Sequence, residues 1–285
     1  MAQCLKNKTK LTKSIVYYSY IRHKPLVMTS PLTAFIDMEF AGIYGTHQRM
    51  QIPIEIGVVM HEPETDTLSF AGRPFSYDID VELWKNVTDE VGKRVNARRR
   101  VFSLAVPGHE KPFDRRFNLD SSGHRQALDA INAVHADLRG FIQSLNRKNI
   151  STLVFFARDR EMTTFNRAKV NTDGFVIRDL QQEIKTHHSL KEHVSLDRMT
   201  LVTGFGIGKA GIYSIHFRYA VPEKIRYIIK PHKAIGDAAR MFLLSRELSD
   251  YPGEFEQNLN IHLAHYEQKK NGNPCSPVES PGSGV

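Results

Sequence analysis

The sequence has few cysteines, no long apolar run and no acidic residue near its N-terminus. Its 285 residues include only two cysteines, Cys4 and Cys275, which lie near opposite ends. Two such distant cysteines exclude a disulfide framework and a thiolate metal site, and nothing indicates an oxidising compartment. No run approaches the roughly 18 consecutive apolar residues that a membrane-spanning helix needs. We therefore expect a cytoplasmic protein without a membrane partner.

The lack of acids marks out a basic N-terminal segment. Asp37 is the first acidic residue, and residues 1–30 carry six basic ones. The formal net charge of the chain is +8, whereas the residues after 30 hold 33 basic and 31 acidic side chains, a net of +2. Residues 1–30 are therefore predicted to be a basic, flexible extension, either a solvated tail or an arm that binds nucleic acid.

The remaining composition is that of one globular domain. Hydrophobic residues make up 41% of the chain and charged residues 25%, as in ordinary soluble proteins. Residues 31–268 show neither an internal repeat nor a linker rich in proline, glycine and serine, so they are predicted to form a single domain. Residues 269–285 lack an apolar period and are predicted to be a disordered tail.

Hydrophobic patterns predict an α/β domain. The predicted elements are strands at 32–38, 52–60 and 67–72, a helix at 125–145, a strand at 152–157, a helix at 160–168, a strand at 175–177 and helices at 180–190, 234–248 and 255–268. Three neighbouring strands followed by alternating helices and strands indicate a mixed sheet. We expect an antiparallel meander and then parallel strands, flanked by α-helices.

Two carboxylates stand on the first predicted strand. In the run FIDMEF, Asp37 and Glu39 are two residues apart, and side chains at that spacing point to the same face of a strand. Two acids on one buried face repel each other and are costly to desolvate. A divalent cation held by carboxylate oxygens would resolve this conflict; the alternative is a strand end exposed to water.

Two later segments carry further polar groups. Asp159 follows the apolar run TLVFFA, where side chains at the carboxyl ends of strands converge in open α/β folds. His232 and Asp237 flank the start of the helix predicted at 234–248. Taken singly, each of these residues could instead cap a helix or interact with its dipole.

Together, three motifs in this order resemble the DnaQ-like exonucleases of the DEDDh type, a branch of the ribonuclease H-like superfamily. The motifs are FIDMEFAG, FFARDREMTTF and HKAIGDA, and the strand IPIEIGVVM adds to the likeness. The resemblance implies a ribonuclease H-like fold. It also implies a 3′-5′ exonuclease that hydrolyses single-stranded DNA or RNA ends with two Mg²⁺ or Mn²⁺ ions and releases nucleoside monophosphates.

Carried over residue by residue, the resemblance implies the following roles. Four acids would be metal ligands, namely Asp37, Glu39, Asp159 and Asp237. His232 would be the general base, and Phe40 would be the wedge under the terminal base. The family commonly has a His-Asn or Gly-Asn pair before the second-motif acid, and this chain does not. Asp173 and Asp179 therefore remain alternatives to Asp159, and an inactive nucleic-acid-binding module remains an alternative function. A homodimer or a polymerase partner is left open.

Two other segments carry recognisable patterns. Residues 82–120 are predicted to be an insertion in which basic residues, including Arg98, Arg99 and Arg100, alternate with aromatic ones. This mixture suits single-stranded nucleic acid, although a solvated loop is an equal alternative. Residues 206–211, GIGKAG, match a dinucleotide fingerprint. Because a strand pattern follows them instead of a helix, we interpret them as a turn between strands.

Overall fold

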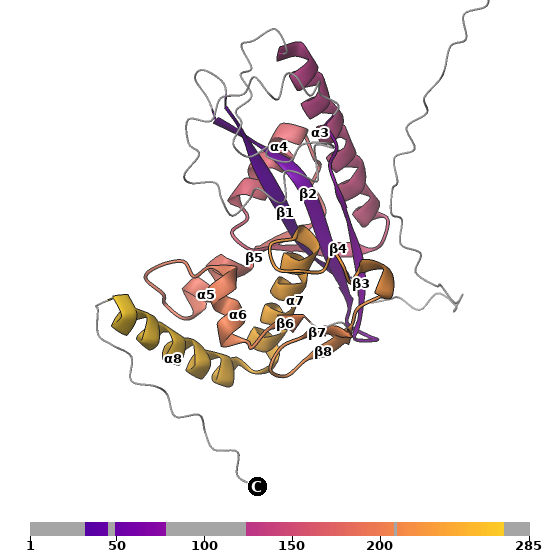
Figure 1. Cartoon of the computed structure of the whole chain (residues 1–285). Coiled ribbons are helices and arrows are strands. Elements are labelled where there is room, and N and C mark those ends of the chain that lie inside the picture. The colour runs from indigo at the N-terminus through magenta and orange to yellow at the C-terminus, as the bar shows by residue number, and fades with distance from the viewer. Residues whose placement is uncertain (1–31, 45–48, 78–123, 208–209, 271–285) are drawn as a thin grey trace, which may run out of the picture.

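The computed structural model describes residues 32–44, 49–77, 124–207 and 210–270 (Figure 1). The predicted extension at 1–30, the insertion at 82–120 with Arg98, Arg99 and Arg100, and the tail after residue 270 lie outside the described residues. Within these ranges, no helix combines the length and apolar character that crossing a membrane requires.

A mixed sheet of five strands forms the centre of the fold. The strands are β1 (Leu32–Tyr44), β2 (Arg49–Glu62), β3 (Thr67–Pro74), β4 (Ile150–Phe155) and β5 (Val176–Asp179). Their order is β3-β2-β1-β4-β5, with β1, β2 and β3 antiparallel and with β4 and β5 parallel to β1. The prediction of an α/β fold with an antiparallel meander followed by parallel strands is therefore confirmed.

Helices flank the sheet, and a small second sheet follows in the chain. The helices are α3 (His124–Asn146), α4 (Asp159–Ala168), α5 (Leu180–His187), α6 (Leu196–Val202), α7 (Ala234–Asp250) and α8 (Pro252–Lys270). The small sheet has the order β6-β7-β8, with β6 at Gly206–Ile207, β7 at Gly211–Tyr213 and β8 at Arg218–Ala220. The sequence prediction missed α6, because its seven residues are too few to show a helical period.

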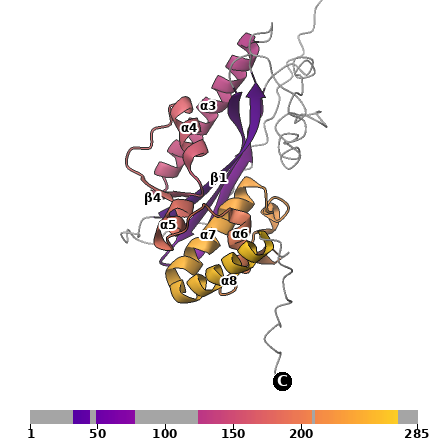
Figure 2. The same cartoon turned by 90° about the vertical axis from the view of Figure 1, so that its left-hand side faces the viewer.

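The alternation of side chains along β1 separates two hydrophobic cores, one on each face of the sheet. Ile36 and Met38 pack in a core with α3 and α4 on one face of the sheet. Phe35 packs with α7 on the other face, and Figure 2 shows these helices on either side of β1. Because successive residues of a strand point to opposite faces, Asp37 and Glu39 share the face of Phe35 and lie on the side of α7.

Two glycines allow close backbone contacts at the start of α7. Gly57 of β2 is paired with Asp37 of β1, and a Cβ atom on Gly57 would overlap the backbone of Ile235. A Cβ atom on Gly236 would overlap the backbone oxygen of Lys230. The missing side chain of Gly57 thus lets the first turn of α7 lie against the sheet beside Asp37, and that of Gly236 lets the segment before α7 pack against the same turn.

We expect Gly236→Ala to destabilise the protein by about 1–3 kcal/mol, because the added methyl group forces the backbone apart. Gly140→Ala is the matched control. Gly140 lies exposed within α3 with no atom near its Cβ position, so alanine there should stabilise the helix by about 0.5–1 kcal/mol. Urea unfolding monitored by circular dichroism measures both changes, and equal midpoints for the two variants would contradict the close approach.

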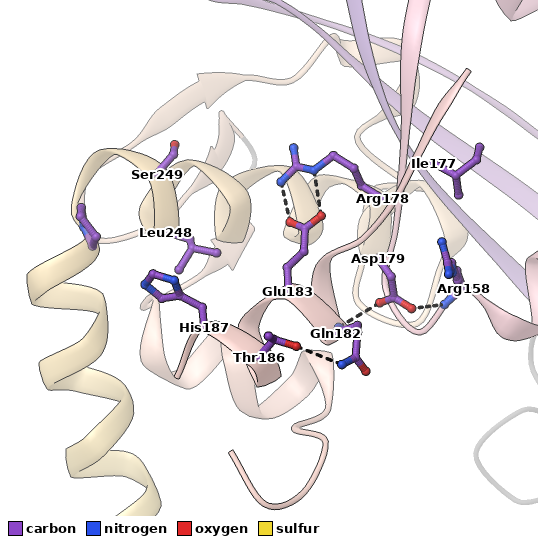
Figure 3. A pocket seen from close by; sticks show the side chains of 11 residues that line it. Arg158, Ile177, Arg178, Asp179, Gln182, Glu183, Thr186, His187, Leu248 and Ser249 are labelled. Carbon is purple, nitrogen blue, oxygen red and sulfur yellow. Dashed lines mark hydrogen bonds and ion pairs between the residues drawn. The ribbon is translucent and has the colours of Figure 1, made fainter. Parts of the chain in front are cut away.

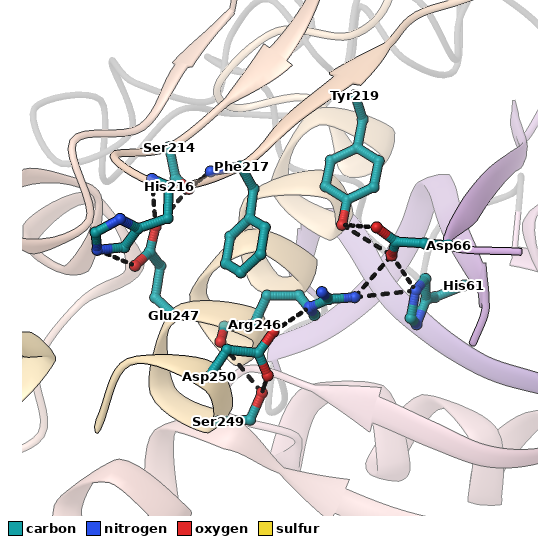
Figure 4. Close-up of polar contacts among 10 residues, drawn as sticks. All are labelled: His61, Asp66, Ser214, His216, Phe217, Tyr219, Arg246, Glu247, Ser249 and Asp250. Carbon is teal, nitrogen blue, oxygen red and sulfur yellow. Dashed lines mark hydrogen bonds and ion pairs between the residues drawn. The ribbon is translucent and has the colours of Figure 1, made fainter. Parts of the chain in front are cut away.

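A polar network holds the other end of α7 (Figure 4). Nη1 of Arg246 lies 2.7 Å from Oδ1 of Asp66 in the turn between β2 and β3. The same carboxylate accepts a hydrogen bond of 3.0 Å from the hydroxyl of Tyr219 in β8, and Nε2 of His61 lies 2.9 Å from it. These contacts join α7, the β2–β3 turn and the small sheet, and so fix the direction in which α7 crosses the large sheet.

Candidate metal centre

Three of the four predicted metal ligands come together in the structure. Asp37 and Glu39 project from β1, and Asp237 projects from the first turn of α7. Each offers one carboxylate oxygen, and the three oxygens lie within 4.8 Å of one another. The period of the strand places the first two side chains, and the close approach of α7 supplies the third. Such a cluster of hard oxygen ligands suits a divalent cation.

The electrostatics of the cluster are those of acids removed from water. Burial raises the pKa of Asp37 well above its usual value, and the charges of Asp237, Glu161 and Glu39 raise it further. Burial also raises the pKa of Asp237, against the opposing effect of Arg240. Mutual repulsion in a poorly solvated place favours protonated acids. A bound cation would reverse that preference, because it is the largest local charge in such a site.

Glu55 extends the cluster on the neighbouring strand. It is paired with Glu39 across β1 and β2 and is buried. Burial raises the pKa of Glu55, whereas the ammonium of Lys233, with its Nζ 3.5 Å from Oε2, lowers it. Glu55 is paired with Lys233 and does not belong to the group of three acids whose carboxylate oxygens lie within 4.8 Å of one another.

The structure does not bring Asp159 into the cluster. Asp159 is exposed at the start of α4, whereas Glu161, two residues later, is 5% exposed. Burial raises the pKa of Glu161 to about 8, and the charges of Asp179 and Glu39 contribute. Oε2 of Glu161 is buried and has no hydrogen-bond partner among the described residues. A buried carboxylate oxygen without a partner is costly, and a nearby cation would satisfy it.

The sequence did contain a pattern that indicates Glu161. The buried face of α4 consists of Glu161, Thr164, Phe165 and Ala168, and spacings of three and four residues define one face of a helix. Asp159 lies outside this face. Asp159 is the acid nearest the end of β4, but the rotation of α4 decides which of its acids is buried.

His232 lies beside the cluster and remains open to solvent. Its backbone N–H donates a hydrogen bond of 3.1 Å to Oδ1 of Asp237, and its φ angle is 61°, a left-handed conformation that costs energy for a residue other than glycine. The imidazole is 68% exposed, with Nε2 4.0 Å from Oδ2 of Asp197 in α6. The imidazole is therefore accessible from solvent beside the acidic cluster.

A buried arginine that the sequence analysis did not predict forms an ion pair with Asp237. The side chain of Arg240 is 2% exposed, and its Nη1 donates to Oδ1 of Asp237 over 2.8 Å. Its Nη2 pairs with Asp197. Residues three apart in a helix are neighbours, so the spacing of Asp237 and Arg240 predicts this pair once the helix is recognised.

The other sequence candidates lie elsewhere. Phe40 is buried in the core with α3, on the face of β1 opposite to Asp37 and Glu39. Asp179 accepts hydrogen bonds from the backbone N–H groups of Ala157, Arg158 and Gln182, and so caps α5 and fixes the turn after β4. Asp173 is exposed in the loop before β5. None of the three belongs to the acidic cluster.

An open pocket of about 680 Å³ lies on the α5 side of the fold (Figure 3). Arg178 is held within it by two hydrogen bonds to Glu183, of 2.9 and 2.6 Å. Asp179 lines the pocket and also raises the pKa of Glu161, so the pocket borders the acidic cluster at this residue. Its two acids, Asp179 and Glu183, are both hydrogen-bonded within the chain.

The GIGKAG segment forms part of an antiparallel pair of strands. β6 ends at Ile207, β7 begins at Gly211, and the two strands pair with each other. A dinucleotide fingerprint requires a helix directly after the glycines, whereas β7 and β8 follow here. The interpretation as a turn between strands is therefore supported, and a dinucleotide site is not.

Comparison with known proteins adds no relative to this description. No model of a known protein family matches the chain, and no curated protein matches it significantly. The fold and the site by themselves define an α/β protein in which three acids gather where a central strand and a crossing helix meet. The buried Glu161 of α4 lies close enough for its charge to raise the pKa of Asp37.

Proposed function

We propose that this protein is a metal-dependent 3′-5′ exonuclease of the DnaQ-like DEDDh type. It would release nucleoside monophosphates from single-stranded DNA or RNA. The observation that carries the proposal is the convergence of Asp37, Glu39 and Asp237, with the buried carboxylate of Glu161 beside them. The order and direction of the five strands are compatible with a ribonuclease H-like fold.

The donor set fits Mg²⁺ or Mn²⁺. The candidate ligands are all carboxylates, and hard divalent cations prefer oxygen ligands. Asp37, Glu39 and Asp237 would hold the ions, and Glu161 would take the place that we first expected for Asp159. Two bound ions would neutralise the charge of a phosphodiester and lower the pKa of a bound water molecule.

Residues of the chain would transfer the proton and orient a metal ligand. His232 would accept the proton of the attacking water, because its imidazole is open to solvent beside the acids and a histidine side chain can act as a general base. Its backbone hydrogen bond to Asp237 fixes it beside the acids. Arg240 donates a hydrogen bond to Oδ1 of Asp237 and so restricts the orientation of this carboxylate.

The direct test is cleavage of strands labelled at the 5′ end. Purified protein with Mn²⁺ or Mg²⁺ should shorten matched DNA and RNA strands stepwise from the 3′ end, and EDTA should stop the reaction. Gel electrophoresis then shows a ladder of shorter labelled products. Strands that stay intact with either metal would refute the proposal for nucleic-acid ends.

A second candidate function is a nucleic-acid-binding module without turnover. The observation that favours it is the contact of Arg240 with Oδ1 of Asp237, because a guanidinium paired with a proposed ligand competes with a metal ion. Binding of a strand that is sensitive to salt but unaffected by EDTA and by Asp37→Ala would support this module. Loss of metal-dependent cleavage in Asp37→Ala would favour the enzyme.

A further inference from the structure

A basic loop with an exposed aromatic ring precedes α7. We call residues 223–233 the rim loop. It carries Lys224, Arg226, Lys230 and Lys233 against the single acid Glu223, a net charge of +3. The phenol ring in its middle belongs to Tyr227, which is 59% exposed. A cationic segment of this kind beside an acidic centre requires an explanation, because the rest of the domain is nearly neutral.

Two buried isoleucines anchor the rim loop. Ile225 and Ile229 are fully buried, and the N–H of Ile229 donates to the carbonyl oxygen of Ile225 over 3.1 Å. The side chains between and around these anchors face solvent; they are Lys224, Arg226, Tyr227 and Lys230. The loop therefore presents its cations and its ring from a fixed backbone, which lowers the entropy lost on binding a ligand.

The C-terminal end of the rim loop forms part of the wall of the metal centre. A turn closed by the 3.2 Å hydrogen bond from the N–H of Lys233 to the carbonyl of Lys230 leads into α7. Within this turn, the backbone of His232 contacts Asp237, and the ammonium of Lys233 contacts Glu55. Tyr227 stands five positions before His232 in the chain, and the backbone of Lys230, between them, lies against Gly236 in the first turn of α7.

From this arrangement we propose that the rim loop binds the single nucleic-acid strand that leads to the metal centre. Lys224 and Lys230 contact its phosphates, and Tyr227 stacks on a base. The proposal rests on the function proposed above. Cations provide salt-dependent affinity for phosphates, and a solvent-exposed ring stacks on any base. An acidic peptide would use the same cations but would leave the ring without a role, so nucleic acid is the better match.

Fluorescence anisotropy with labelled single strands of DNA and of RNA tests this proposal in EDTA, where metal-dependent cleavage cannot occur. Lys224→Ala combined with Lys230→Ala should weaken binding about five-fold or more at low salt. It should also reduce the slope of log K against log salt by about 1.4, or 0.7 for each phosphate contact. Tyr227→Ala should weaken binding about five-fold or more, whereas Tyr227→Phe should restore it, because phenylalanine keeps the stacking surface.

The matched control is Arg147→Ala combined with Lys148→Ala. These two exposed cations lie just before the start of β4, at the opposite end of that strand from the acids, and their removal changes the net charge equally. Equal affinities of the rim variants and this control, or a wild-type protein that binds neither strand, would overturn the proposal. So would binding of poly-glutamate that is as tight as that of a strand.

The same experiment separates this inference from the enzymatic proposal. If the rim variants lose affinity in EDTA and the wild-type protein nevertheless cleaves no strand with Mn²⁺, the rim loop is retained and the exonuclease is rejected. If cleavage occurs and the rim variants bind and cleave as the wild type does, the exonuclease is retained and the rim loop is rejected.

Discussion

Asp37→Asn is expected to reduce metal-dependent strand cleavage by about 10³-fold or more. The substitution keeps the shape of the side chain but removes one negative charge from the centre of the acidic cluster, where three acids offer oxygens within 4.8 Å of one another. Metal ions contribute several kcal/mol to the stabilisation of such a reaction, and each 1.36 kcal/mol corresponds to a factor of ten in rate. Initial rates with saturating Mn²⁺ measure the loss.

Asp129→Asn is the control for this variant. Asp129 is an exposed residue of α3, so its substitution changes the net charge equally without touching the cluster. Its rate should stay within a factor of two of the wild type. An Asp37→Asn protein that is folded and retains more than one tenth of the wild-type rate would show that the cleavage arises elsewhere or from a contaminant.

Glu161→Gln is expected to stabilise the metal-free protein at neutral pH while it reduces cleavage about 10²-fold. Burial raises the pKa of Glu161 to about 8 in the folded protein, from an ordinary value of 4.5. Between these two pH values the unfolded chain has released the proton and the folded chain still binds it. The unfolded state then binds fewer protons, so stability falls as the pH rises through this window and levels off above pH 8.

Glutamine has no proton to lose, so it removes this contribution to the pH dependence. At pH 7 the gain in unfolding free energy is on the order of 3 kcal/mol as an upper limit. Urea unfolding in EDTA from pH 5 to pH 8 should show a flatter profile for Glu161→Gln than for the wild type. The increase in melting temperature that Mn²⁺ gives the wild type should be strongly reduced, since binding to the folded state is what stabilises it.

Asp159→Asn discriminates between the two acids of α4. Asp159 is exposed in the first turn of that helix, where a negative charge stabilises the helix by about 0.3–1 kcal/mol. The variant should therefore lose only this small amount of stability and keep its response to Mn²⁺ and its rate. Should Asp159→Asn lose activity while Glu161→Gln keeps it, the assignment from the structure would be wrong and the one from the sequence right.

The positions of the basic residues in the fold, as well as their charges, decide which of them could contact a ligand at the metal centre. The sequence predicts a nucleic-acid surface at the basic run of Arg98, Arg99 and Arg100, which lies outside the described residues. The rim loop was not singled out, because a segment with four cations in eleven residues is unremarkable in a basic chain. Its importance arises from its two buried anchors and from its contacts with Glu55 and Asp237.

The sequence by itself determined the α/β class, the face shared by Asp37 and Glu39, and the helix that carries Asp237. Each of these follows from a local period, two residues in a strand and 3.6 in a helix, and needs no knowledge of distant contacts. The order of strands and helices along the chain was also sufficient to predict the antiparallel and parallel parts of the sheet.

Only the tertiary structure decided which acids meet. Asp237 reaches Asp37 because Gly57 leaves room for α7 against the sheet. Glu161 is buried and Asp159 is exposed because Glu161 shares the buried face of α4 with Phe165 and Ala168. Both outcomes depend on the rotation and approach of a helix relative to a strand far away in the chain. The packing of side chains across the whole domain fixes these two quantities, and no local period contains them.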